Sequence, residues 1–286
     1  MFAYSLTHDV NITTVLRTRL LTAIILIPIV IGLIYLGGVA FLALVTLLLT
    51  LAEVEFCNLV AKDGFRPNVV LGIGGMWLLL MDAYLPVDLL RPGLALLLLG
   101  SLAWQIFHRQ GAPVANWALT VTSGLYLGIC GACLINLREQ TDGLWWTMTS
   151  IPSIMLADTG AYFVGRVWGR HKMAPTLSPG KTWEGYVAGI ISGGLLTGLL
   201  ASLWCIGAGP DTILTRWHGF FLGSIIAILA PLGDLGVSMI KRTVEVKDSG
   251  NIIPGHGGAL DRVDSVLWAA VIGYYYVQIV SSNIFN

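Results

Sequence analysis

The sequence predicts an all-α, polytopic integral membrane protein of about nine transmembrane helices. Of the 286 residues only 11% are charged and 56% are hydrophobic, and the mean hydropathy is +0.78. A soluble domain carries about 25% charged residues, so this chain could not cover a water-facing surface. Apolar residues also recur in runs of roughly 20, the length that crosses a bilayer. The formal net charge of zero argues against a nucleic-acid-binding surface.

The apolar runs define the candidate spans in order. Turn-forming residues separate several of them, as at Gly37-Gly38, Arg66-Pro67-Asn68 and Arg91-Pro92-Gly93. The predicted spans are Leu20–Leu36, Val39–Val60, Val69–Leu85, Gly93–Phe107, Trp117–Leu137, Leu144–Gly165, Tyr186–Gly207, Trp217–Ile240 and Ser265–Ile284.

The distribution of basic residues predicts the orientation of these spans. Cytoplasmic loops of membrane proteins carry an excess of lysine and arginine. With the N-terminus inside and nine spans, 13 of the 16 basic residues lie on the inner side, and only Arg91, Arg138 and Arg216 lie outside. We therefore expect a cytoplasmic N-terminus and an external C-terminus.

The charged residues suggest three regions. Residues 1–18 are expected to be a cytoplasmic extension, residues 19–137 to form about five membrane helices, and residues 138–286 to form a catalytic membrane region. Within that last region, two predicted cytoplasmic loops, 158–185 and 234–264, hold almost half of all charged residues. Both loops mix acidic and basic side chains with glycine and proline, so chemistry is expected there.

The predicted span Trp217–Ile240 contains an acidic residue. An isolated carboxylate at membrane depth costs at least about 2.5 kcal/mol. Ser238 and Lys241 follow Asp234 by four and seven positions, on the same helical face. This pattern indicates a metal or phosphate ligand at the cytoplasmic end of a helix, or, alternatively, an Asp–Lys pair that reaches the interface.

The segment after this span is basic and rich in glycine. Gly257 and Gly258, beside His256, would let backbone N–H groups approach an anion closely. The alternative is a basic loop that only touches anionic lipid headgroups, but this would not explain the acidic residues. Fixed positive charge suited to a triphosphate and a phosphomonoester comes from four residues: Lys241, Arg242, Lys247 and Arg262.

Two carboxylates open the last predicted helix. Asp261 and Asp264 are three positions apart, which places them on one helical face. Mg²⁺ prefers a few carboxylates together with water and substrate phosphates, and Asp234 adds a third carboxylate. The alternative is that Asp261 is the N-cap and Asp264 a favourable first-turn charge.

The other charged loop contains Ser178-Pro179-Gly180-Lys181-Thr182. A phosphate-binding P-loop would need glycine five residues before Gly180, where the sequence has Pro175. We still expect Lys181 and Thr182 to contact phosphate. One helical face leading to the same side carries three further polar residues: Asp158, Tyr162 and Arg166.

Together these residues resemble the phosphatidate cytidylyltransferase, or CDP-diacylglycerol synthase, family. The resemblance covers most of the chain, leaving residues 1–16 as an extension with no family counterpart. It rests on Ser238-Met239-Ile240-Lys241-Arg242, Lys247-Asp248-Ser249-Gly250, Pro254-Gly255-His256-Gly257-Gly258 and Asp261-Arg262-Val263-Asp264, with weaker support from Ala157–Tyr162, Ser178–Gly185 and Arg19–Ala23.

The resemblance implies that CTP and phosphatidate give CDP-diacylglycerol and pyrophosphate for phospholipid biosynthesis. It implies a Mg²⁺-dependent, two-cation centre whose ligands match Asp234, Asp261 and Asp264. It also implies a homodimer in the inner, cytoplasmic membrane with its active site facing the cytoplasm. Catalytic roles are expected for Lys241, Arg242, Lys247, Asp248 and His256, and substrate phosphate binding for Ser238, Lys181, Thr182, Arg262, Gly257 and Gly258.

Two other functions fit parts of the pattern. A CTP-dependent polyprenol or lipid kinase would use similar groups but transfer the γ-phosphoryl group to an alcohol. An ion-coupled transporter could line an ion path with Asp158 and Asp234. The polar groups gather at one membrane face, however, and no pair of interrupted, repeat-related helices is evident, which argues against transport.

Overall fold

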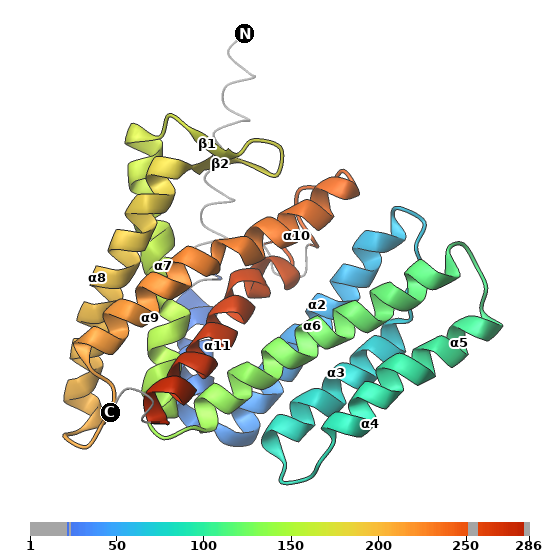
Figure 1. Ribbon diagram of the computed structural model, residues 1–286, viewed down its shortest axis with the longest axis horizontal. Coiled ribbons are helices and arrows are strands. Elements are labelled where there is room, and N and C mark those ends of the chain that lie inside the picture. Colours follow the sequence, from blue (N-terminus) through green and yellow to red (C-terminus); the bar gives the residue numbers. More distant parts are fainter. Residues whose placement is uncertain (1–21, 23, 251–256, 283–286) are drawn as a thin grey trace.

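The structure, a computed structural model, describes residue 22, residues 24–250 and residues 257–282. This part of the chain is helical apart from one small sheet (Figure 1). A first helix, Ile24–Leu36, precedes α2 (Gly38–Ala61), α3 (Val69–Tyr84), α4 (Leu90–Ala95), the π-helical turn η1 (Leu96–Gly100), α5 (Ser101–Phe107), α6 (Pro113–Glu139), α7 (Gly143–Trp168), β1 (Lys172–Ala174), β2 (Ser178–Thr182), α8 (Trp183–Ala208), α9 (Arg216–Leu229), α10 (Pro231–Thr243) and α11 (Leu260–Ser281).

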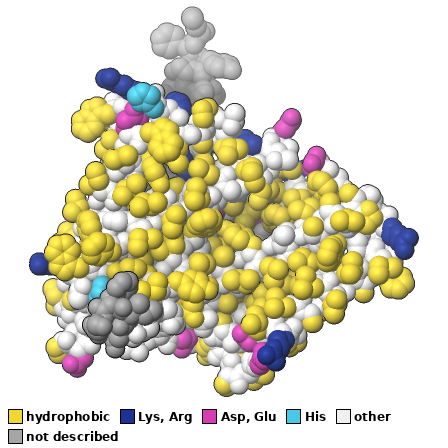
Figure 2. Space-filling model, viewed as in Figure 1, with side chains coloured by type: hydrophobic (Ala, Val, Ile, Leu, Met, Phe, Trp, Pro, Cys, Tyr) yellow, Lys and Arg dark blue, Asp and Glu magenta, His cyan; other side chains and the backbone are white. Residues whose placement is uncertain are grey.

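The composition and surface of these helices fit a membrane. Among the described residues, six helices are long and apolar enough to cross one: α2, Leu90–Phe107, α6, α8, Arg216–Thr243 and α11. Hydrophobic side chains cover most of the face in Figure 2, and charged ones lie at its edges. Large apolar side chains such as Phe107 and Ile206 are each 82% exposed, as expected for contact with lipid. The prediction of an all-α polytopic membrane protein is confirmed, whereas the nine-span count and the sides of the termini stay predictions.

The helices form two groups with α11 between them. Helices α2 to α6 lie on one side and α7 to α9 on the other (Figure 1), and α11 contacts both groups. One buried apolar cluster joins α2, α3 and α6 to Leu267 of α11. A second joins Trp146 of α7 and Leu222 of α9 to Val277 of α11. The last helix therefore links the two halves of the core.

Two predicted spans are interrupted in the structure. The run Trp217–Ile240 is divided between α9 and α10, because Pro231 occupies the first position of α10 and has no N–H to donate. The span predicted from Gly93 begins at Leu90 and contains the turn η1. There the Ser101 hydroxyl donates to the Leu97 carbonyl, a side-chain bond that competes with regular helix geometry.

The charged segments 158–185 and 234–264 are only partly loops. Helix α7 continues through Asp158 to Trp168, and Asp234 lies in the first turn of α10. Between α7 and α8 the chain forms an antiparallel hairpin that the sequence analysis did not predict, in which Lys172 pairs with Thr182. The hairpin lies at the same end of the molecule as the C-terminal end of α10 (Figure 1), which positions Lys181 near the charged helix.

Candidate active site

Two ion pairs connect the hairpin, α10 and α11. Lys181 of β2 places its Nζ 2.5 Å from Oδ2 of Asp234. Lys241 lies about two turns further along the same face of α10, and its Nζ is 2.6 Å from Oδ1 of Asp261 in α11. Four of the residues selected from the sequence thus form one charged site, although they come from three separate elements.

Close packing of α10 on α11 brings the carboxylates together. A side chain at Gly233 would collide with the backbone of Asp264, so only glycine permits this approach. Asp234 then lies within electrostatic range of Asp264, and Asp264 within range of Asp261. Asp158 of α7 lies within electrostatic range of Lys181 and Asp234. We call these four aspartates and two lysines the charged cluster.

Asp261 is the most highly bonded member of this cluster. Its Oδ2 accepts from the backbone N–H of Ser249 at 2.9 Å, from the Ser249 hydroxyl at 3.0 Å and from the Gly258 N–H at 3.3 Å. Gly257 has a φ of +80°, and a side chain there would press against Asp261. Helix α11 begins at Leu260 with Ala259 as its N-cap, so the alternative that Asp261 is the N-cap is wrong.

The donor set can be tested for its fit to Mg²⁺. Within the described ranges, no three acidic, histidine or cysteine side chains converge closely enough to hold a metal ion as they stand. Two of the aspartates instead contact lysines. If the four aspartates are ionised and the two lysines protonated, the charged cluster carries a net charge of −2. Carboxylate oxygens are also the ligands that Mg²⁺ prefers. The chemistry of the cluster therefore fits a divalent cation.

Other residues predicted for the site have structural partners. Arg242 donates to the carbonyls of Leu177 in the hairpin and of Val246, at 3.4 and 3.1 Å, so it ties α10 to the hairpin. Thr182 is the N-cap of α8 and accepts from the Gly185 N–H. The Tyr162 hydroxyl accepts from Arg166 on the same face of α7.

The remaining predicted residues surround the cluster. Ser238 is buried on α10, between Asp234 and Lys241 along the helix. Lys247 and Asp248 are exposed in the segment after α10, and Arg262 is exposed on α11. Gly258 is buried beside Asp261. His256 lies outside the described residues.

One acidic residue near the cluster was missed as a functional candidate. Glu55 of α2 is 3% exposed, and its carboxylate reaches the segment that precedes α11. The available signal was its position in an apolar span, where a carboxylate is costly and usually functional. Neither acidic residue of that span, Glu53 or Glu55, was assigned to the site from the sequence.

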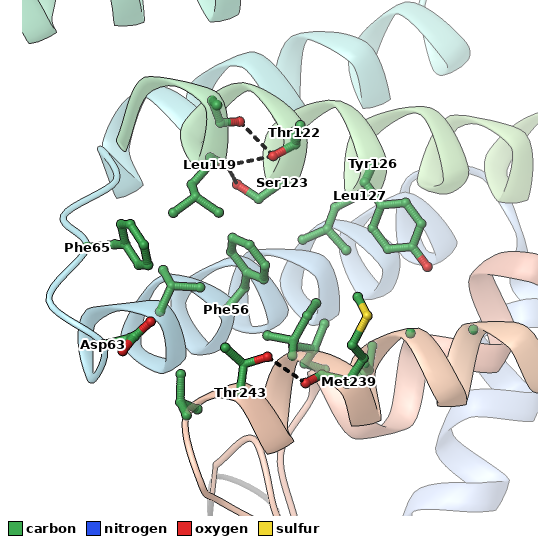
Figure 3. A pocket seen from close by; sticks show the side chains of 18 of the residues that line it. Phe56, Asp63, Phe65, Leu119, Thr122, Ser123, Tyr126, Leu127, Met239 and Thr243 are labelled. Carbon is green, nitrogen blue, oxygen red and sulfur yellow. Dashed lines mark hydrogen bonds between the residues drawn. The ribbon is translucent and has the colours of Figure 1, made fainter. Parts of the chain in front are cut away.

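An apolar cavity of about 730 Å³ lies between α2, α6 and α10, next to the charged cluster. Figure 3 shows Phe56 of α2, Leu119 of α6 and Met239 of α10 around it. Gly233 and Gly236, on either side of Asp234 in the sequence, also line it. Its volume is within the range of about 300–1,000 Å³ that is typical of ligand pockets.

Comparison with known proteins shows that the chain is a membrane-embedded nucleotidyltransferase. The model of the cytidylyltransferase family matches residues 17–280. The chain therefore belongs to the cytidylyltransferase family. The resemblance found in the sequence is confirmed, and the interpretation as an ion-coupled transporter is set aside.

Several relatives are named phosphatidate cytidylyltransferase. The protein of Brucella suis is 34% identical over 276 residues, covering 91% of this chain and 93% of the relative. That of Staphylococcus saprophyticus is 32% identical over 256 residues, covering 88% and 95%. The match to the Mycobacterium bovis protein is also 32% identical but spans only 58% of that relative's length.

Proposed function

We propose that this protein transfers the cytidylyl group of CTP to phosphatidate, giving CDP-diacylglycerol and pyrophosphate. The observation that carries the proposal is that the charged cluster and the apolar cavity meet at α10, where Gly233 lines the cavity and packs against the backbone of Asp264. A substrate with a phosphate head and apolar tails needs these two environments in contact. The names of the relatives support the same pair of substrates.

In the proposed reaction, a phosphate oxygen of phosphatidate forms a bond to the α-phosphorus of CTP, while the bond to the pyrophosphate oxygen breaks. The attacking phosphate is already anionic, so no strong general base is required. Lys181 and Lys241 would leave their aspartate partners and bind substrate phosphates. Their fixed positive charge would stabilise the charge that develops on the leaving pyrophosphate.

The resident metal is proposed to be Mg²⁺, accompanied by a second cation. Asp234, Asp261 and Asp264 would hold it, because Asp264 lies at the contact of α10 and α11 within electrostatic range of the other two carboxylates. When bound, such a cation neutralises negative charge on the transferring and leaving phosphates. Release of Asp234 and Asp261 from their lysines would accompany its binding.

The acyl chains are proposed to occupy the apolar cavity. Its walls carry large hydrophobic side chains such as Phe56, Leu119 and Met239. Helix α10, which forms one wall, also carries Asp234 and Lys241 of the charged cluster. Leu119→Trp should fill part of the cavity and raise the KM for long-chain phosphatidate, with little change in the KM for CTP. An equal rise in both constants would contradict this assignment.

The reaction itself is tested with purified protein in detergent micelles containing phosphatidate, CTP and Mg²⁺. CTP labelled at the α-phosphorus should yield labelled CDP-lipid, and CTP labelled at the γ-phosphorus should yield labelled pyrophosphate. Transfer of the γ-label to a polyprenol or another lipid alcohol would instead identify a lipid kinase. Removal of Mg²⁺ with a chelator should abolish turnover, and its return should restore it.

The location and assembly are part of the same proposal. We propose that the charged cluster lies at the cytoplasmic face of the inner membrane, which the excess of basic residues on the predicted inner side supports. CTP would reach the cluster from the cytoplasm and phosphatidate from the bilayer. The homodimer implied by the family resemblance stays a prediction.

A further inference from the structure

We infer that Glu55 of α2 is a positioning residue that holds the start of α11, and with it Asp261, in the geometry required for turnover. This inference rests on the proposed function only for its activity readout. Glu55 is 3% exposed, and its carboxylate makes its contacts about 200 positions further along the chain. It is thus a link between the two halves of the molecule.

The first contacts of Glu55 cap helix α11. The opening N–H groups of a helix have no partner within that helix, and the N-cap residue, Ala259, has no side chain that could accept from them. Glu55 accepts from the N–H of Ala259 at 3.0 Å and from that of Leu260 at 2.9 Å. A carboxylate at this end also complements the helix dipole. A residue of α2 therefore supplies the cap that the sequence of α11 lacks.

A further contact connects Glu55 to the charged cluster. The Ser249 hydroxyl lies 2.8 Å from Oε2 of Glu55 and 3.0 Å from Oδ2 of Asp261, and its single proton can serve one of them at a time. Asp261 also accepts from the Ser249 backbone and pairs with Lys241. Any shift of the Glu55 carboxylate is therefore transmitted through Ser249 to Asp261.

The surrounding glycines are fitted to this carboxylate. A side chain at Gly250 or at Gly258 would collide with the carboxylate of Glu55. Both glycines belong to the segments that carry the family resemblance. Because neither glycine has a side chain, the Glu55 carboxylate fits between the segment after α10 and the start of α11. The glycines and Glu55 are thus parts of one arrangement.

Glu53 provides a matched control on the same helix. Its side chain is also fully buried, but Oε1 accepts from Ser123 and Cys57, and no bond between Glu53 and α11 is present among the described residues. Glu53→Gln and Glu55→Gln therefore make the same carboxylate-to-amide change on the same helix, at two buried positions. Only the second substitution places an amide NH₂ against the donors of the α11 cap.

The experiment measures hydrogen exchange and steady-state kinetics on both variants of the full-length protein. In Glu55→Gln we expect several-fold faster amide exchange confined to residues 257–265, and a kcat lower by about 10- to 100-fold, the scale of a misplaced catalytic group. Glu53→Gln should match the wild type in both. The inference is overturned if exchange at the start of α11 is unchanged in Glu55→Gln, or if Glu53→Gln shows the same losses.

A second variant keeps the inference testable if Glu55→Gln does not fold. Ser249→Ala removes the bridge but leaves the cap, so kcat should fall severalfold while exchange over residues 257–265 stays at the wild-type rate. A kcat within about twofold of the wild type, less than roughly 0.4 kcal/mol, would overturn the link to Asp261. If the wild type makes no CDP-lipid, the proposed function fails, but the exchange data still decide the role of Glu55.

Discussion

The Lys241–Asp261 pair can be separated into its structural and catalytic contributions. Both side chains are 10% exposed, and the N–O distance is 2.6 Å. At that separation two unit charges attract by about 6 kcal/mol at an effective dielectric constant of 20, although desolvation offsets much of this. Removing one partner of a buried pair costs about 3–5 kcal/mol, whereas replacing both partners by neutral groups is close to neutral.

Two variants compare the loss of one partner of this ion pair with the replacement of both. Asp261→Asn should lower the melting temperature markedly, because it leaves the buried Lys241 ammonium without its counter-charge. Lys241→Met combined with Asp261→Asn should recover most of that loss. Both proteins should nevertheless make CDP-lipid at least about 100-fold more slowly than the wild type, equivalent to roughly 2.7 kcal/mol of transition-state stabilisation. The reason is that Asp261 is proposed to bind the cation and Lys241 to bind the substrate phosphates, so restoring the fold restores neither role.

The measurements are thermal melting in detergent and the initial rate of CDP-lipid formation across a Mg²⁺ titration. If the doubly substituted protein regains a rate within a few-fold of the wild type, the pair only supports the fold. That result would refute its assignment to the catalytic centre. A wild-type melting temperature for Asp261→Asn alone would show that the pair adds no stability.

Three further predictions concern the hairpin, the α8 cap and the topology. Lys181→Met should raise the KM for CTP by about tenfold, or roughly 1.4 kcal/mol, whereas Lys172→Met, at an exposed position of the same hairpin, should leave it unchanged in steady-state assays. Thr182→Ala should cost about 1 kcal/mol of stability, as for a lost N-cap, and should raise the KM for CTP because Thr182 is expected to contact phosphate; an unchanged KM would leave the residue a helix cap alone. A reporter fused after Lys247 should be cytoplasmic and one at the C-terminus external, and a cytoplasmic C-terminus would contradict nine spans.

The positions of most helices could be predicted from hydropathy and turn residues. Asn68, for example, ends a turn and caps α3, so the predicted start at Val69 agrees with the structure. Hydropathy does not register a missing N–H, and the break at Pro231 was therefore overlooked. The hairpin was missed because its short strands contain proline and glycine and show no alternation of apolar and polar residues.

Which site residues lie next to one another could be predicted only where they share a helix or a short segment. Helical periodicity grouped Asp234 with Lys241 and Asp261 with Asp264, and the structure brings both groups together. The contact of Lys181 with Asp234 and the contact of Glu55 with Ser249, 194 positions away, depend on how separate elements pack. Local spacing carries no information about such pairings.

The position of α11 has a consequence for biosynthesis. This helix packs against both helix groups and carries Asp261 and Asp264, yet it leaves the ribosome after every other described helix. The charged cluster stays incomplete until the last segment inserts between partners that already reside in the bilayer. A chain stalled before Leu260 would thus be lodged in the membrane without activity. Adding α11 as a separate polypeptide would complete the charged cluster only if the Glu55 carboxylate of α2 were still accessible to the first N–H groups of α11.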